Sequence, residues 1–345
     1  MNGSLEHLTL SNESKAGCIP FTKQDPISTK TIKAACYTLM MLLSLLGNAA
    51  VIAIVVKNRH MRTTTNYLIA NMALSDLLLS TFAVPREIVE IFIGSRRWLI
   101  DGLAGAVLCK AVYFFQDIST AVSIQSIVAI TLDRYNGVVS PFRRPIITPK
   151  RRKFVIALIW LISVALHGIY FYTVRRKRVK GVSFCFFDNP RAVKINFVMI
   201  SVVLIAIPLI IIIVLYSLMF RALKRQTPFW NGCSSSLMKR RQNENSKIMW
   251  KILAILVLFV ICILPIDIIG FLFFFAWYKV IPCGLDHLSF AAKFIFYSNA
   301  SLNPYIYFLL NERYRQGLRN ILKGKVYFPR EEVIKDIEMN TLKHM

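Results

Sequence analysis

Residues 118–135 read ISTAVSIQSIVAITLDRY, an apolar run that ends in Asp133-Arg134-Tyr135. A second signature, Asn303-Pro304-Tyr305-Ile306-Tyr307, closes another apolar run later in the 345-residue chain. Seven such runs occur, at residues 33–57, 66–93, 106–133, 154–174, 194–220, 248–277 and 287–310. Each is long enough to cross a hydrocarbon core of about 30 Å as a helix. Because the runs lack period-two alternation, the sequence predicts an all-α membrane protein, a seven-transmembrane-helix bundle in a lipid bilayer.

The composition supports this prediction. Hydrophobic residues make up 55% of the chain, and the mean hydropathy is +0.52. The formal net charge of +25 is also typical of proteins that bind nucleic acid. Here, however, the basic residues gather in the connections between apolar runs, as in a membrane protein. We therefore expect no nucleic-acid partner.

The direction of insertion is predicted from the Lys and Arg residues of the connections. With the N-terminus outside, the inner loops and tail carry more of them than the outer ones, as the positive-inside rule requires. The basic segment at 175–180 runs against the rule, because it would lie outside. We expect a multi-pass plasma-membrane protein with an extracellular N-terminus and a cytoplasmic C-terminus.

Four parts of the chain are predicted. They are an extracellular tail at 1–32, a transmembrane domain at 33–310, a membrane-surface helix at 311–323 and a cytoplasmic tail at 324–345. The surface helix is amphipathic, because apolar residues from Tyr314 to Leu322 recur at helical spacing with arginines between them. On the outer tail, Asn2 and Asn12 each begin a glycosylation tripeptide.

Four cysteines fall on the outer side or at the outer membrane edge, namely Cys18, Cys109, Cys185 and Cys283. The outside is oxidising, so pairing is expected. Four cysteines allow three connectivities. We favour Cys109 with Cys185, which ties the outer end of the third helix to the following outer loop, and Cys18 with Cys283 as a second pair.

Several polar residues lie inside the apolar runs, where they are costly and usually functional. Asp76, Ser123 and Asn299 lie at similar depths, and Asn303 lies one turn further inward. They predict a small hydrated cavity with one carboxylate, which suits a sodium ion or a proton. Hydrogen bonds between helices without an ion explain the same residues. Apart from this sodium ion, no metal or cofactor is expected.

Motifs in a fixed order along the chain resemble those of rhodopsin-like G-protein-coupled receptors. They are Gly47-Asn48, Leu74-Ser75-Asp76, Asp133-Arg134-Tyr135, Trp160, Pro208 with Tyr216, Phe259 with Pro265, and the signature at 303–307. The resemblance covers about residues 35 to 322, and residues 61–78 are most similar to neuropeptide receptors of the neuropeptide Y or galanin type. It implies a cell-surface receptor that activates heterotrimeric G proteins, with arrestin as a further candidate partner.

The resemblance assigns activation and G-protein coupling to Asp133, Arg134, Tyr135, Phe142, Tyr216, Pro265 and Tyr307. Arg134 would pair with Asp133 at rest and be released toward a bound G protein in the active form. Pro265 removes a backbone hydrogen bond and kinks the sixth helix, which gives its inner half a hinge. One position departs from the family, because Ile263 replaces the usual tryptophan. We expect Phe259 and Asp267 to trigger the movement instead.

A ligand pocket is predicted below the outer loop. Its residues are Glu87, Gln116, Asp117, Phe187, Asp267 and Tyr297. Amine receptors that resemble this chain have an aspartate at the position of Gln116, whereas Asp117 is expected on a different helix face. Glu87 and Glu90 add negative charge, which with the aromatic residues suits a peptide end bearing an arginine and an aromatic residue. The basic segment at 175–180 suits an acidic peptide segment, or lipid headgroups and glycans.

A seven-helix transporter or channel is the alternative function. Internal repeats and broken helices, which are typical of transporters, are not evident in the sequence. An enzyme is not expected, because no metal cluster or nucleophile constellation appears in the apolar runs. Ligand-dependent nucleotide exchange on a G protein distinguishes a receptor from a transporter.

Overall fold

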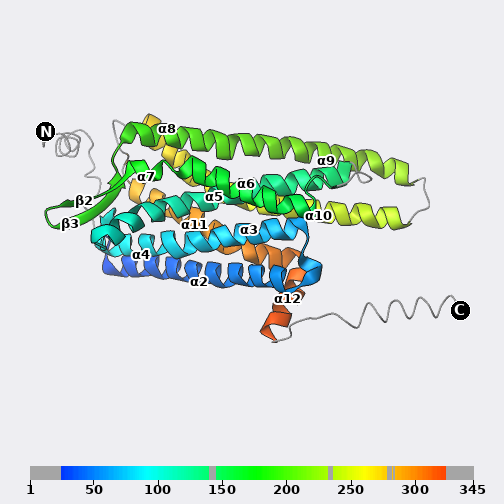
Figure 1. The fold of residues 1–345 in the computed structure, drawn as a ribbon, viewed down its shortest axis with the longest axis horizontal. Coiled ribbons are helices and arrows are strands. Elements are labelled where there is room, and N and C mark those ends of the chain that lie inside the picture. The colour runs from blue at the N-terminus through cyan, green and yellow to red at the C-terminus, as the bar shows by residue number, and fades with distance from the viewer. Residues whose placement is uncertain (1–24, 140–144, 232–235, 278–281, 283, 324–345) are drawn as a thin grey trace.

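The computed structural model describes residues 25–139, 145–231, 236–277, 282 and 284–323. Its helices run along one common axis as a bundle (Figure 1). The first span is α2 (Ile27–Lys57), which a 3-10 turn, η1 (Arg59–Met61), follows. The second is α3 (Thr64–Leu78), a π-helical turn η2 (Leu79–Ala83) and α4 (Val84–Ile93). The third is α5 (Gly102–Val139), and the fourth is α6 (Pro149–His167) with α7 (Tyr170–Thr173).

The fifth span consists of α8 (Pro190–Ile200), the π-helical turn η3 (Ser201–Ala206) and α9 (Ile207–Asn231). The sixth is α10 (Ser236–Phe271) with the π-helical turn η4 (Leu272–Ala276), and the seventh is α11 (Leu285–Leu310). Among the described residues, six helices are long and apolar enough to cross a membrane. The seventh, α11, is 26 residues long and is less apolar because its middle carries several serines and asparagines.

The exterior of the bundle is apolar, and its largely apolar interior also contains polar side chains. Leu46, Leu161 and Ile210 are among the large apolar side chains that are exposed on the outer faces of the helices. Asn48 and Asp76, in contrast, are buried between helices. This arrangement is expected where lipid replaces water as the solvent and polar side chains face the bundle interior. The predicted fold class is thereby confirmed.

Two close approaches hold the inner part of the first helix. At Gly47 of α2, an added Cβ atom would lie 2.8 Å from the Cβ of Pro304 in α11. Helix α12 (Glu312–Leu322), which the sequence predicted as a membrane-surface helix, contacts α2 through Gly317, where an added Cβ would lie 2.7 Å from a methyl group of Ile54. Asn311 caps α12 by accepting a hydrogen bond from the Arg313 amide at 3.2 Å.

A small antiparallel sheet covers the outer end, opposite to α12 (Figure 1). Its strands are β1 (Arg97–Trp98), β2 (Val174–Val179) and β3 (Val182–Phe187), in the order β1-β3-β2. The β2–β3 hairpin turns through Lys180 and Gly181, which both have positive φ, as tight hairpin turns require. The sequence did not predict this hairpin, because the basic segment shows no apolar alternation.

The predicted pairing of Cys109 with Cys185 is confirmed. The disulfide joins α5 to β3 with a Cα–Cα distance of 5.8 Å, and both cysteines are buried. It therefore fixes the hairpin over the outer end of the third helix. The other predicted pair, Cys18 and Cys283, lies outside the described residues, as do Asn2, Asn12 and Phe142.

Candidate functional site

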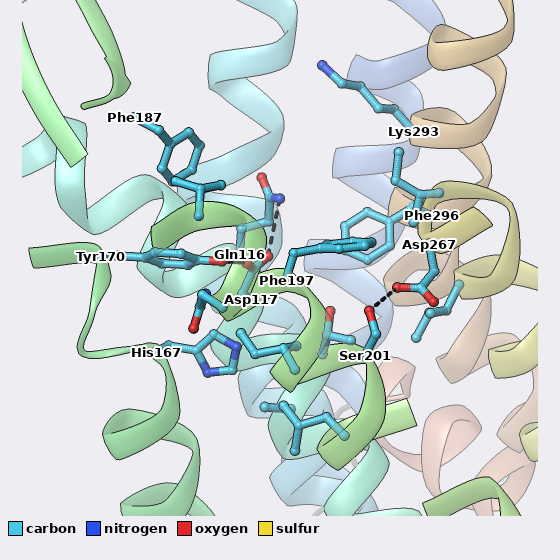
Figure 2. Close-up of a pocket in the computed structure, with 18 of the residues that line it drawn as sticks. Gln116, Asp117, His167, Tyr170, Phe187, Phe197, Ser201, Asp267, Lys293 and Phe296 are labelled. Atoms are coloured by element: carbon cyan, nitrogen blue, oxygen red, sulfur yellow. Dashed lines mark hydrogen bonds between the residues drawn. The ribbon is translucent and has the colours of Figure 1, made fainter. Parts of the chain in front are cut away.

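A cavity of about 580 Å³ lies between the helices at the outer end, below β3 (Figure 2). All six side chains that the sequence predicted as ligand-binding line it. They are Glu87 of α4, Gln116 and Asp117 of α5, Phe187 of β3, Asp267 of α10 and Tyr297 of α11. Gln116 and Asp117 face the same cavity, and Gln116 Nε2 lies 3.3 Å from Asp117 Oδ1. Consecutive residues of a helix point about 100° apart, so the two lie on different faces as expected, but both border this wide cavity.

The outer wall of the cavity contains a compact ionic cluster. Arg86 contacts both Glu87, at 2.5 Å, and Glu90, at 3.1 Å. Lys293 of α11 approaches Glu87 from the other side, with a distance of 3.1 Å between Nζ and Oε2. The guanidinium carbon of Arg86 also lies 4.5 Å from the centre of the Tyr113 ring. Two cations thus face two carboxylates, so the glutamates bring no net negative charge, contrary to the expectation from the sequence.

Neutral side chains complete this cluster and link three spans. Tyr297 Oη lies 2.8 Å from Gln116 Oε1 and 3.2 Å from Glu87 Oε1. Arg86 Nη2 lies 3.3 Å from the same Gln116 oxygen. The second, third and seventh spans are therefore tied together at one level of the outer bundle.

The floor of the cavity carries two further carboxylates. Asp117 accepts a short hydrogen bond from the hydroxyl of Tyr170 and a longer one from Gln116. Asp267 accepts a hydrogen bond from Ser201 of η3 at 2.7 Å. Figure 2 shows Asp117 and Asp267 on opposite sides of the cavity. Unlike the glutamates, neither forms an ion pair with any part of the chain that the structure describes.

Deeper in the bundle, Asp76 is buried and hydrogen-bonded to two spans. Asn303 Nδ2 lies 3.0 Å from one of its oxygens, and Ser119 Oγ lies 3.4 Å from the other. Ser123, which the sequence predicted, lies 3.4 Å from Ser75 instead. The side-chain oxygens of Asn299 and Asn303 are buried and have no hydrogen-bond partner within the described chain. Carboxylate and amide oxygens are the kinds of ligand that a small cation binds.

At the inner end, Arg134 pairs with Asp133 at 2.5 Å. Tyr135 packs against an apolar cluster of Val138, Met219 and Met249, which Tyr216 also contacts. The buried hydroxyl of Tyr307 has no partner among the described residues, and its ring lies 5.9 Å from that of Tyr314.

Helix α10 connects the outer cavity with the inner half of the bundle. Ile263 is 3% exposed and lines the cavity, and Asp267 lines it one turn further out. Pro265 lies between them inside the helix. Phe259, one turn further inward, is buried in the core. Residues of α10 on both sides of Pro265 therefore line the cavity.

Several residues of these sites escaped the sequence prediction. Arg86 and Lys293 lie near the ends of apolar runs, where a charge is commonly just an anchor at the membrane edge. Tyr170 and Ser201 are ordinary residues for a span, and only their hydrogen bonds to aspartates mark them. Ser119 precedes Ser123 by one helical turn, and this spacing was the available signal.

Comparison with known proteins identifies similar receptors. The family model described as "7 transmembrane receptor (rhodopsin family)" matches residues 47–307. The chain is 29% identical over 317 residues to the tachykinin-like peptides receptor 86C of Drosophila melanogaster. That match covers 86% of this chain and 60% of the relative, so the chain spans less than two thirds of that receptor.

Two mammalian relatives are similarly distant. The chain is 28% identical over 303 residues to the neuropeptide FF receptor 2 of Mus musculus, covering 82% of this chain and 70% of the relative. It is also 28% identical over 328 residues to the pyroglutamylated RF-amide peptide receptor of Rattus norvegicus, covering 89% of this chain and 72% of the relative. The predicted relationship to neuropeptide receptors is thus confirmed, and a transporter is not favoured. Because the family model spans most of the transmembrane helices, this chain belongs to the rhodopsin family of seven-transmembrane receptors.

Proposed function

We propose that this protein is a plasma-membrane receptor that binds an extracellular peptide and activates a heterotrimeric G protein. The observation that carries the proposal is the outer cavity, which contacts α10 on both sides of Pro265 while Arg134 lies at the opposite end of the bundle. The relatives named for tachykinin-like peptides, neuropeptide FF and RF-amide peptides support a peptide ligand. The protein then acts as a receptor without catalysis, with its N-terminus outside and its C-terminus, G protein and arrestin inside.

The proposed mechanism uses the kink in α10. A peptide that contacts Asp267 and Ile263 holds the outer half of α10 against the neighbouring helices. The inner half then swings outward about Pro265, because a proline lacks the hydrogen bond that stiffens a helix. Arg134 leaves Asp133 and faces the G protein. Peptide and G protein stabilise each other's binding, since both prefer this state.

The Asp76 site has a separate proposed role as an allosteric sodium site. Asp76 supplies the charge, and the free side-chain oxygens of Asn299 and Asn303 supply further ligands. A sodium ion that binds only the inactive arrangement shifts the equilibrium away from the active one. Ser119 completes this site by its contact with Asp76.

A peptide-library screen with a G-protein activation readout tests the function. For an activating peptide, Arg134→Ala should retain binding at the outer cavity and lose nucleotide exchange. The matched control is Arg151→Ala, which removes an exposed arginine from the inner end of α6. Normal exchange by Arg134→Ala contradicts the proposed mechanism. A complete library that activates neither wild type nor control contradicts the peptide ligand.

A further inference from the structure

The charges that line the outer cavity are not evenly compensated. Arg86 and Lys293 are engaged by Glu87 and Glu90 in the outer wall. The remaining cation that lines the cavity, Arg96, is an exposed residue of the loop before β1. The two floor aspartates therefore have no cationic partner in the described chain.

The floor is also rich in hydrogen-bond acceptors. Asn196 lines the same cavity and is 4% exposed, and its buried side-chain oxygen has no hydrogen-bond partner within the described chain. His167 also lines the cavity, and its Nδ1 lies 2.8 Å from the Ser163 carbonyl. The hydroxyls of Tyr170 and Ser201 are donors, but both are already used by the aspartates. A bound group must therefore supply several donors and a positive charge.

We propose that the floor of the cavity, between Asp117 of α5 and Asp267 of α10, binds a guanidinium group of the ligand. The inference deepens the proposed peptide-receptor function and rests on it. A guanidinium brings five N–H donors, no acceptor and a permanent charge, which matches the acceptor oxygens of two carboxylates. An ammonium offers fewer donors and is more strongly hydrated. The aromatic rings of Phe197 and Phe296 line the same cavity and suit a planar cation.

The position of Asp267 gives the subsite a role in activation. Asp267 lies two positions after Pro265 and is hydrogen-bonded to Ser201, so it links the sixth span to the π-helical turn of the fifth. A guanidinium between the aspartates also engages Asp117 on the third span. It thereby connects three spans at the level of the kink.

The test uses a synthetic library of short amidated peptides in which each arginine is also made as citrulline. Citrulline keeps the shape of the side chain but replaces the guanidinium by a neutral urea. An arginine peptide should activate wild type at least about 30-fold more potently than its citrulline partner, since losing one partner of a buried charge pair is costly. Asp117→Asn and Asp267→Asn should lower the potency of the arginine peptide by a similar factor and leave the citrulline peptide nearly unchanged.

Asp188→Asn is the matched control, because it makes the same change at an exposed aspartate outside the cavity. The proposal is overturned if both floor variants respond normally, or if they weaken arginine and citrulline peptides equally. It also fails if only peptides without arginine activate, whereas the receptor function then stands. If no peptide activates, purified protein gives the answer: argininamide, and not citrullinamide, should raise the melting temperature of wild type and leave that of both floor variants unchanged.

Discussion

Arg86 is the residue that sets the charge of the outer cavity. Its side chain is 9% exposed and contacts Glu87, Glu90 and Tyr113 together. A buried ion pair is weak support for stability as a whole, but breaking one leaves an uncompensated charge. The ion pairs of Arg86 therefore add little stability themselves, but removing Arg86 would leave buried carboxylates without a partner.

Arg86→Gln should lower the free energy of unfolding by about 3–5 kcal/mol, because Glu87 and Glu90 then share Lys293 alone. Thermal melting of the purified protein in detergent measures this loss. Adding Glu90→Gln should recover part of it, since one of the stranded carboxylates is then neutral. Arg97→Gln, at an exposed position of β1, is the control. If the double variant melts at the same low temperature as the single variant, the charge argument is refuted.

Asp76→Asn should abolish the effect of sodium on agonist binding. In wild type, sodium should lower agonist affinity by its preference for the inactive state, and without the carboxylate this preference is lost. Competition binding at several sodium concentrations measures the effect. The structure adds a sharper comparison, because Ser119→Ala should weaken the sodium effect more than Ser123→Ala does. Equal sodium sensitivity in wild type and Asp76→Asn would end the sodium-site proposal.

At the scale of helices and strands, the spans were predictable and the outer sheet was not. A span must satisfy its own backbone inside lipid, so a long apolar run leaves only the helix as a solution. The amphipathic helix α12 was predictable because its apolar residues recur at helical spacing. The hairpin obeys no such constraint, because its strands lie beyond the ends of the apolar helices and β2 is mostly charged. Its one local signal was the pair Lys180-Gly181, which favours a tight turn.

The packing of α2 on α11 depends on a glycine. Gly47→Ala places a Cβ atom 2.8 Å from the rigid ring of Pro304, so one helix must shift. We expect a loss of about 1–3 kcal/mol in the free energy of unfolding, as for other overpacked interiors. Gly137→Ala is the control, because nothing lies within 4 Å of its added Cβ, and alanine favours a helix. Thermal melting of both variants decides the point, and equal melting temperatures would contradict it.

At the scale of the whole molecule, three polar sites follow one another along the bundle. The outer cavity, the Asp76 site and the Asp133–Arg134 pair lie at the outer end, the middle and the inner end. The sequence indicates the depth of their principal residues, because depth follows from position along a helix. It missed the pairing of Glu87 with Arg86 and Lys293, since the rotation of neighbouring helices decides which charges meet.

The floor of the outer cavity lowers the stability of the protein when no peptide is bound. The carboxyl groups of Asp117 and Asp267 then face one cavity, half-buried and without a cationic partner in the described chain. The same carboxyl groups that favour binding of a cationic ligand therefore lower the stability of the ligand-free protein. Asp117→Asn with Asp267→Asn should melt at a higher temperature than wild type in the absence of peptide. A lower melting temperature would show that the carboxylates stabilise the empty protein. If the double variant melts at the higher temperature, as expected, the empty wild-type protein unfolds easily and cells remove it quickly. The protein then persists longest where its peptide is present.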